Sequence, residues 1–473
     1  MEFVKIKCYN FIKAMGGATI FMKKVDATKG PLTKLIFIYT LPLILTTIIQ
    51  DLFTIADKAV LGNMAGSTAV AAIGATGTVS TLILNGAVGL SSGASIVLAR
   101  FVGQKNDEKI RETIDTSIVM SLAFGLVVAV AGFFLAPVFL TATRCPAECY
   151  DGALIYMRIY LAGAPATLLY NYGSAIMRTL GDTQRPMIYI TVAGVVNVVL
   201  NIVLCFVLKE KVAAVAIATV ASKVIGATLI VIRLCRLNDS AKVILSRIRF
   251  NLSAFTRILR FGVPTAISRL VLPLGNLQIT TAINSFGVNA VAGQAASASI
   301  NTIVNAFSTG FGVATTVFMG QNIGAKDVGR VRKSFWSFLG FNVLITGTLG
   351  LFVCLTGRFW IGIIVGASEK VAIDYGMNRM MHVTLFMFVN AINSVLNHAL
   401  QAFGYPMFTS ITNIAFNLGF RVLWMQFVYP LRPIFDTVNL CFTVSWILNM
   451  TFYAIFTVFV YRRYVKKGIC KKI

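Results

Sequence analysis

The sequence is poor in charge, and above all in acidic residues and histidine. Only 12% of its 473 residues are charged, with 17 Asp and Glu residues in total and 2 His residues. A soluble protein of this length carries about 25% charged residues, so the composition excludes an ordinary soluble domain. No Cys and His residues have metal-ligand spacing, and no Ser/His or paired-Asp grouping lies in the apolar segments. We therefore expect no metal, no cofactor and no enzymatic activity.

Long apolar runs fill most of the chain instead: 57% of the residues are hydrophobic and the mean hydropathy is +0.79. Runs of about 20 apolar residues match the length of a helix that crosses a bilayer, whereas a β-barrel would show short alternating segments. We predict an all-α polytopic membrane protein with twelve transmembrane helices. The spans centre near Ile44–Leu61, Val70–Val97, Ile114–Leu135, Ala153–Ile176, Met187–Leu208, Val212–Ile232, Ile258–Ile283, Val291–Val317, Phe335–Leu355, Met377–Leu400, Met407–Val428 and Leu440–Val460. The second and eighth spans are rich in small residues, which suits close helix packing or a cavity wall.

Basic residues gather in alternate loops. In a soluble protein the net charge of +25 would suggest nucleic acid, but no aromatic-interleaved basic fold accompanies it, so we expect no nucleic-acid partner. Lys and Arg follow the second, fourth, sixth, eighth and twelfth spans, whereas Gly62–Ser67 and Ser285–Asn289 contain none. The loop Phe403–Pro406 has no basic residue and gives no support either way. By the positive-inside rule, both termini are cytoplasmic.

The ends of the chain and one outer loop carry further expectations. Residues 1–30 read as a basic cytoplasmic arm that contacts anionic lipid rather than as a signal peptide, unless translation starts at Met22. Residues 465–473 read as a basic tail. Cys145 and Cys149 are predicted in an outer loop, as two unpaired thiols or as a local disulfide.

An internal repeat organises the chain at a shift of about 220 residues. The matching pairs are Leu41-Pro42 with Val263-Pro264, Ala69-Val70-Ala71 with Ala290-Val291-Ala292, Gly103 with Gly324, and Pro186 with Pro406. Each half holds an even number of spans, so the halves enter the membrane in the same direction, as parallel repeats with a cavity between them. We predict two six-helix bundles: an N-lobe (31–236), a cytoplasmic linker (237–257) and a C-lobe (258–464).

Three stretches together resemble one family. The Pro42-to-Asp57 spacing, the Gly181-Asp182-Thr183-Gln184-Arg185-Pro186 loop and Asn197-Val198-Val199-Leu200-Asn201 are similar to the multidrug and toxic compound extrusion (MATE) family, from about Pro31 to Tyr464. The likeness is closer to the branch typified by the DNA-damage-inducible F proteins. It implies a secondary antiporter in the bacterial inner membrane that expels organic, often cationic, compounds by alternating access of two lobes. We expect it to act as a monomer.

The resemblance also implies a site for the coupling ion, H⁺ or Na⁺, in the N-lobe. Its acid would be Asp57, helped by Asn197, Asn201 and Thr219. Many relatives have a second acid where this chain has Asn201, and no acid lies between Pro264 and Ile279 to form a C-lobe site. Other interpretations stay open: Asp57 could pair with Lys58 at the end of the span, the two asparagines could hold helices together, and Thr219 could bond its own helix.

Several other residues stand out within the spans. Pro42 and Pro264 remove backbone donors and are predicted to bend their helices. An ammonium group at the depth of Lys223 needs a partner or a water-filled cavity, and we expect it to sense the charge of Asp57. His398 is expected to line a cavity, although a lone His is more often a packing residue. The candidate cavity-lining residues are Gln50, Lys223, Arg269, Asn393, Asn397 and His398.

A second function fits the same architecture: a flippase for lipid-linked sugars. Such a protein needs several cationic side chains to bind the pyrophosphate, whereas the sequence offers only two obvious candidates, Arg269 and Lys223. We therefore rank it below the exporter.

Overall fold

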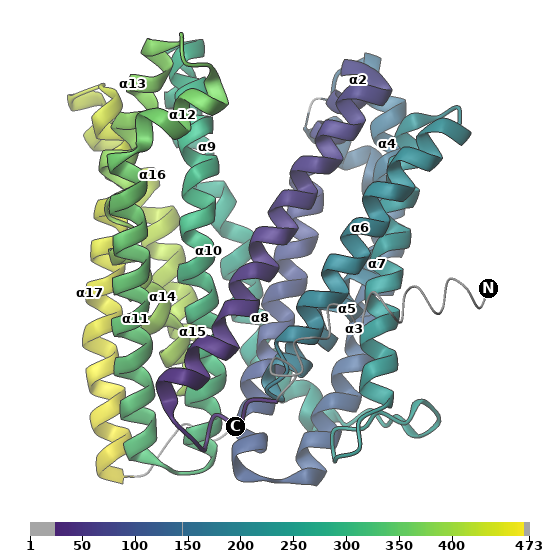
Figure 1. The fold of residues 1–473 in the computed structure, drawn as a ribbon, viewed down its shortest axis with the longest axis vertical. Helices are drawn as coiled ribbons and strands as arrows, with labels where there is room; N and C mark the ends of the chain where they lie inside the picture. The colour runs from purple at the N-terminus through teal and green to yellow at the C-terminus, as the bar shows by residue number, and fades with distance from the viewer. Residues whose placement is uncertain (1–23, 144, 468–473) are drawn as a thin grey trace.

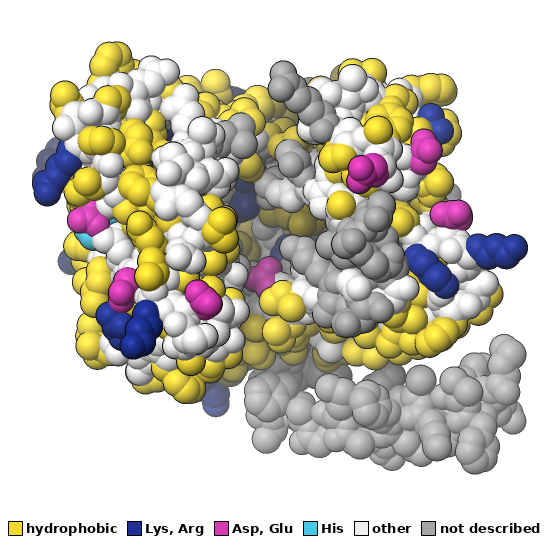
Figure 2. Space-filling view, turned by 90° about the horizontal axis from the view of Figure 1, so that it is seen from above, with side chains coloured by type: hydrophobic (Ala, Val, Ile, Leu, Met, Phe, Trp, Pro, Cys, Tyr) yellow, Lys and Arg dark blue, Asp and Glu magenta, His cyan; other side chains and the backbone are white. Residues whose placement is uncertain are grey.

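The computed structural model describes residues 24–143 and 145–467, apart from the side chains of residues 57–59, 61, 63, 65–70, 78, 272, 277 and 467. The described residues form helices and no β-strand. Figure 1 shows two helical lobes that meet at one end and diverge at the other. Seen from the diverging end, the surface is hollowed between the lobes (Figure 2).

The N-lobe comprises the first six spans. Its helices are α2 (Leu32–Gln104), α3 (Asp107–Ala142), α4 (Ala147–Ala162), α5 (Ala164–Thr179), α6 (Gln184–Val207) and α7 (Lys211–Cys235). The pair α4 and α5 bends by 45° at Gly163 and together is long enough for one span. The linker to the second lobe contains one 3₁₀ turn, η2 (Leu245–Arg247).

The C-lobe repeats this plan with more interruptions. Its helical segments are α8 (Leu252–Gly275), α9 (Leu277–Asn284), α10 (Val288–Gly324), α11 (Val328–Leu355), α12 (Gly357–Val365), α13 (Lys370–Arg379), η3 (Met380–Thr384), α14 (Met387–Ala402), α15 (Pro406–Ile414), η4 (Ala415–Gly419), α16 (Phe420–Leu423), η5 (Trp424–Val428), η6 (Tyr429–Leu431) and α17 (Phe435–Lys467). The segments η3, η4 and η5 are π-helical insertions. Such insertions are frequent at functional sites.

The predicted twelve spans agree with these helices. Within the described residues, ten helices are long and apolar enough to cross a membrane, and the bent pair α4 and α5 makes eleven. The broken helical run at 406–428 matches the remaining predicted span. The first span begins at Leu32, close to residue 31, where the predicted N-lobe starts. Near its start, Ile36 and Tyr39 are buried against residues of the second lobe.

The helix α2 contains two spans, Leu32–Ala56 and Ala71–Gln104. Ile44 contacts Gly310 and Gly103 contacts Gln321, two places about 16 Å apart along α10. In a straight helix, Ile44 and Gly103 would lie about 90 Å apart. The chain must therefore fold back between the two spans, as Figure 1 shows.

The internal repeat is visible in the turns. Lys105 and Lys326 adopt left-handed φ angles of 54° and 59° where α2 and α10 end. The next helices start in matching ways, because the side chains of Asn106 and Asp327 accept hydrogen bonds from Lys109 N and Arg330 N, at 3.0 and 2.8 Å. These acceptors satisfy free backbone donors at the helix N-termini. Two distant parts of the chain thus form the same turn.

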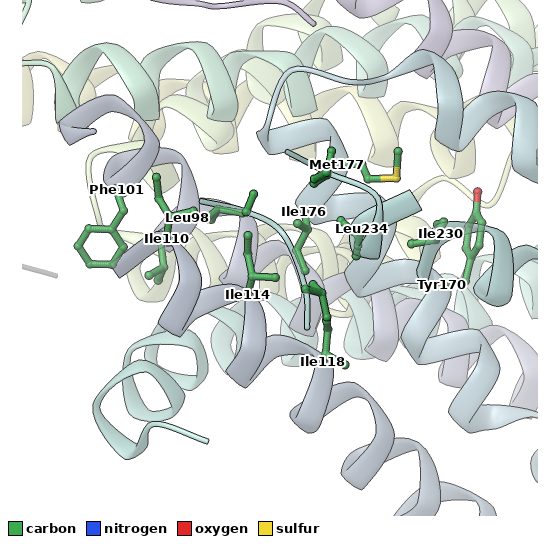
Figure 3. Packing of buried hydrophobic residues seen from close by; sticks show 14 of the residues in the cluster. Leu98, Phe101, Ile110, Ile114, Ile118, Tyr170, Ile176, Met177, Ile230 and Leu234 are labelled. Carbon is green, nitrogen blue, oxygen red and sulfur yellow. The ribbon is translucent and has the colours of Figure 1, made fainter. Parts of the chain in front are cut away.

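Apolar packing between helices holds the N-lobe together. Leu98 and Phe101 of α2 pack with Ile110, Ile114 and Ile118 of α3, and with residues of α5 and α7 (Figure 3). Burying each such side chain contributes about 1.5–3 kcal/mol in water, but lipid is itself apolar, so within the membrane close contact between helices matters more.

Close contact joins the two lobes at one end. A Cβ at Gly93 would lie 2.5 Å from Gly262 N, and a Cβ at Gly103 would lie 1.9 Å from Gln321 O, so no larger residue fits there. Arg100 donates to Ala402 O at 2.7 Å, and Gln321 donates to Thr179 O at 2.7 Å. Among the ten candidate spans, Val288–Gly324 has the largest share of buried residues in its apolar segment. The small residues of the eighth predicted span indicated such close packing.

The lobes meet at the end that carries the basic loops, which we call the basic end. Residues 24–30 lie there and bridge the two lobes: Val25 N donates to Gly181 O, and Ala27 O accepts from Asn322 and Arg330. The rest of the predicted arm, including Met22, and most of the predicted tail lie outside the described residues. The Sγ atoms of Cys145 and Cys149 are 3.7 Å apart, and both residues are free thiols.

Candidate functional site

The described residues enclose a cavity of about 370 Å³ in the N-lobe, one of about 510 Å³ in the C-lobe and one of about 170 Å³ between the lobes. Basic side chains are visible inside the hollow in Figure 2. The two larger volumes fall within the range of small-molecule sites.

The N-lobe cavity is bounded by α2, α4, α5, α6 and α7, and it combines an acid with a base. Asp51 is the one acidic residue among its described lining residues, and Lys223 lines the same cavity. Gln50, Asn197 and Thr219 also line it. A carboxylate at membrane depth costs roughly 3 kcal/mol on insertion scales, so such a group is generally retained for a function. A carboxylate can accept a proton, and carboxylate and amide oxygens can both ligate a hard cation.

The structure describes some, but not all, of the other residues that we predicted for the coupling site. Asn201 is fully buried, and its Nδ2 donates to Asn197 Oδ1 at 3.4 Å, so the two asparagines lie together on α6. The hydroxyl of Thr219 donates to Val215 O of its own helix at 2.9 Å, one of the two interpretations left open above. Asp57 belongs to α2, but its side chain lies outside the described residues, so its role stays a prediction.

The C-lobe cavity has the opposite character. Arg269, Arg379, Arg421 and His398 line it together with nine asparagines, and no Asp or Glu is among its described lining residues. The asparagines are Asn276, Asn301, Asn305, Asn390, Asn393, Asn397, Asn413, Asn417 and Asn449. The predicted residues Arg269, Asn393, Asn397 and His398 therefore come together on one cavity wall.

Neutral groups hold Arg421 in place. Its guanidinium donates to Ser445 Oγ at 3.2 Å, to Asn276 Oδ1 at 2.9 Å and to Asn417 Oδ1 at 3.0 Å. Asn417 in turn donates to Asn413, which donates to Ser268 Oγ at 2.9 Å. These contacts orient the guanidinium without neutralising its charge.

The cavity between the lobes connects the two sites. Gln50 lines both this cavity and the N-lobe cavity, while Arg269 and His398 line both this cavity and the C-lobe cavity. The Nδ1 atom of His398 lies 2.7 Å from Ser394 O of its own helix. Arg178, near the end of α5, also lines this cavity. Polar groups thus separate neighbouring cavities from one lobe to the other.

Two prolines and one loop from the sequence analysis lie within or next to helices. Pro42 lies inside α2 and Pro264 inside α8, and their predicted role as bending points stays a prediction. The carboxylate of Asp182 accepts from Arg185 N at 3.2 Å and pairs with the Arg185 guanidinium. Asp182 therefore satisfies a free backbone donor in the first turn of α6.

Sequence reasoning missed Asp51, Arg379 and Arg421. Asp51 and Arg379 lie inside helices that are long and apolar enough to cross a membrane, and Arg421 lies in the broken helical run at 406–428. An ionisable residue in a predicted span is itself a sign of function. The repeat gave a second signal, because Arg421 stands 220 residues after Asn201, at the shift that relates the two halves.

The MatE family model matches the chain twice, over residues 42–203 and 264–424. The chain belongs to the MatE family. The paired match also agrees with the internal repeat, since each half of this MatE protein corresponds to one copy of the family unit. The resemblance to this family is thereby confirmed, while the assignment to the DNA-damage-inducible branch stays a prediction.

Relatives of this MatE protein match most of its length. The probable multidrug resistance protein YpnP of Bacillus subtilis is 25% identical over 415 residues, which cover 88% of this chain and 91% of the relative. The probable multidrug resistance protein YoeA of the same organism is 22% identical, covering 80% of this chain and 82% of the relative. An outward-facing structure of a multidrug resistance MATE family transporter superposes with a TM-score of 0.84 at 21% identity, covering 94% of this chain and 99% of that one. This likeness shows the fold: a multi-pass, two-lobed membrane protein.

Proposed function

We propose that this MatE protein is a secondary active exporter of organic compounds that acts as an antiporter driven by proton or sodium entry. The observation that carries the proposal is the N-lobe cavity, in which Asp51 shares a membrane-depth wall with Asn197, Thr219 and Lys223. Multidrug resistance relatives support the export of drug-like compounds. We place the protein in the bacterial inner membrane with both termini in the cytoplasm.

In this proposal, the structure corresponds to the outward-open state. The lobes are closed at the basic end, where Arg100 and Gln321 make hydrogen bonds between them. The positive-inside rule puts the basic end in the cytoplasm, so the hollow faces outward. An ion that binds one of the two states more tightly shifts the equilibrium between them, and a substrate with the opposite preference is moved in exchange.

The coupling acid in this proposal is Asp57, as the family resemblance implies, and Asp51 is the neighbouring acid that lines the cavity. The test is efflux of a fluorescent organic compound from proteoliposomes under an imposed proton or sodium gradient. We expect Asp57→Asn to abolish gradient-driven efflux, because an amide cannot be protonated or supply a charged ligand. The variant Asp51→Asn, in the same helix, tests whether the acid that lines the cavity also takes part in ion coupling.

Insertion and folding are checked by size-exclusion chromatography of each variant. The gradient that drives wild-type efflux identifies the coupling ion. If Asp57→Asn and Asp51→Asn both transport like the wild type, coupling through the N-lobe is wrong.

A flippase for lipid-linked sugars remains the second candidate, and one observation favours it. The C-lobe cavity adds Arg379 and Arg421 to the single cationic candidate, Arg269, that the sequence offered in this lobe. Such a cluster suits a pyrophosphate group. Transfer of an isoprenyl-pyrophosphate lipid between leaflets, without any ion gradient, would support this candidate over the exporter.

A further inference from the structure

The C-lobe cavity contains buried positive charge that the described part of the chain does not neutralise. Arg379 and Arg421 are 7% and 6% exposed, and within the described residues neither forms an ion pair. Buried charges are normally paired, because removing an ion from water is costly. A pair of unneutralised arginines in one cavity therefore requires an explanation.

Arg379 also has unused donors. Its Nε and Nη1 atoms are buried and find no hydrogen-bond acceptor among the described residues, although the side chain lines the cavity. Nearly all buried polar groups in native proteins are hydrogen-bonded, and exceptions often mark a functional site. Arg379 thus keeps hydrogen-bonding capacity, beside the cavity, that the described residues do not use.

Both guanidinium groups share one aromatic ring. The Cζ atoms of Arg379 and Arg421 lie 5.4 and 4.5 Å from the centre of the Phe442 ring. The negative face of the ring attracts each cation, but the two cations repel each other. An anion placed between them would relieve this repulsion, and guanidinium groups bind carboxylate and phosphate through two parallel hydrogen bonds.

The rest of the wall defines what else the ligand carries. Phe442, Trp446 and Tyr453 supply aromatic surface, and many asparagines supply neutral donors and acceptors. No described acid lines the cavity, so no carboxylate there would pair with an organic cation. The volume of about 510 Å³ admits a small organic molecule.

We propose that the C-lobe cavity binds organic anions, meaning compounds that carry a carboxylate or phosphate group on an aromatic body. This inference rests on the proposed export function and specifies its substrate class, in contrast to the cationic compounds that the family resemblance implies. Arg379 and Arg421 bind the anionic group, and the aromatic side chains contact the ring. The N-lobe keeps the acid, so ion coupling and substrate binding lie in different lobes.

The test is isothermal titration calorimetry on the full-length protein in nanodiscs, with three matched probes: naphthoate, naphthyl phosphate and naphthylmethylammonium. We expect both anions, or one of them, to bind roughly ten-fold or more tightly than the cation. The two anions distinguish a carboxylate site from a phosphate site. Equal or tighter binding of the cation would overturn the proposal.

The variant Arg379→Gln should weaken anion binding roughly ten-fold, because it removes charge-assisted hydrogen bonds. The matched control is Arg358→Gln, which removes an exposed arginine of the same lobe whose partner is Asp374, and which should leave binding unchanged. If Arg379→Gln does not fold, Arg269→Gln tests the same wall. A folded Arg379→Gln with wild-type anion affinity would contradict the proposal.

The outcomes separate this inference from the export proposal. If naphthoate binds but no gradient drives its efflux, the export proposal fails and the anion site stands. If gradients drive efflux of the cation while neither anion binds, the anion site fails alone.

Discussion

At the scale of single residues, the ionisable side chains inside the spans carry the account. Those with partners inside one helix or one loop, such as Asp182 with Arg185, could be predicted from the sequence. The sequence could not predict that Arg379 and Arg421 lie beside the same ring, because only the fold places Phe442 next to both. The sequence indicates which groups are out of place in a membrane, but not which of them meet.

Lys223 gives a prediction at this scale. In the export proposal, its ammonium group stabilises the deprotonated form of an acid in the N-lobe. Lys223→Ala removes this positive charge, so deprotonation requires more alkaline conditions. We expect the midpoint of pH-dependent efflux to move up by about one pH unit.

The control for this prediction is Lys209→Ala, which removes an exposed lysine before α7 and should leave the midpoint in place. Efflux from proteoliposomes across a pH series measures the effect. An identical midpoint in Lys223→Ala and the wild type would mean that this lysine does not sense the acid.

At the scale of helices, the apolar pattern predicted the twelve spans, because length and hydropathy are local properties. It did not predict where the helices continue past the membrane or break. Near the start of the first span, Ile36 and Tyr39 pack against the other lobe, a contact between distant parts of the chain that no local pattern predicts. The π-helical insertions that begin at Ala415 and Trp424 flank Arg421, and no apolar period signals them.

The contact between α2 and α10 provides a prediction for these elements. Gly103→Ala places a methyl group against the backbone of Gln321. Overpacking of this kind costs about 1–3 kcal/mol, so we expect a lower midpoint of thermal unfolding in detergent.

Gly340→Ala is the matched control, since a Cβ at Gly340 in α11 meets nothing within 4 Å. Alanine is also the better helix former, so this variant should be neutral or slightly stabilised. Equal midpoints for the two variants would show that the close approach of α2 and α10 does not limit packing.

At the scale of the whole molecule, the duplicated chain forms two lobes with unlike interiors. The repeat predicted the shared architecture, because matching turns such as those at Lys105 and Lys326 follow from matching residues. It did not predict the divergence, in which one half has Asn201 and the other has Arg421. An acid in one cavity and arginines in the other suggest that one lobe senses the ion and the other holds the cargo.

The central claim is that the two lobes alternate between a state closed at the basic end and a state closed at the opposite end. A distance measured between the outer ends of the two lobes tests this claim most directly. Spin labels are placed at Glu148, at the start of α4, and at Glu369, just before α13. Figure 1 shows these two helices on different lobes at the diverging end. Double electron–electron resonance in nanodiscs should give two distances, whose populations shift with the coupling ion or with substrate. A single distance that no pH, sodium concentration or organic compound changes would contradict the account.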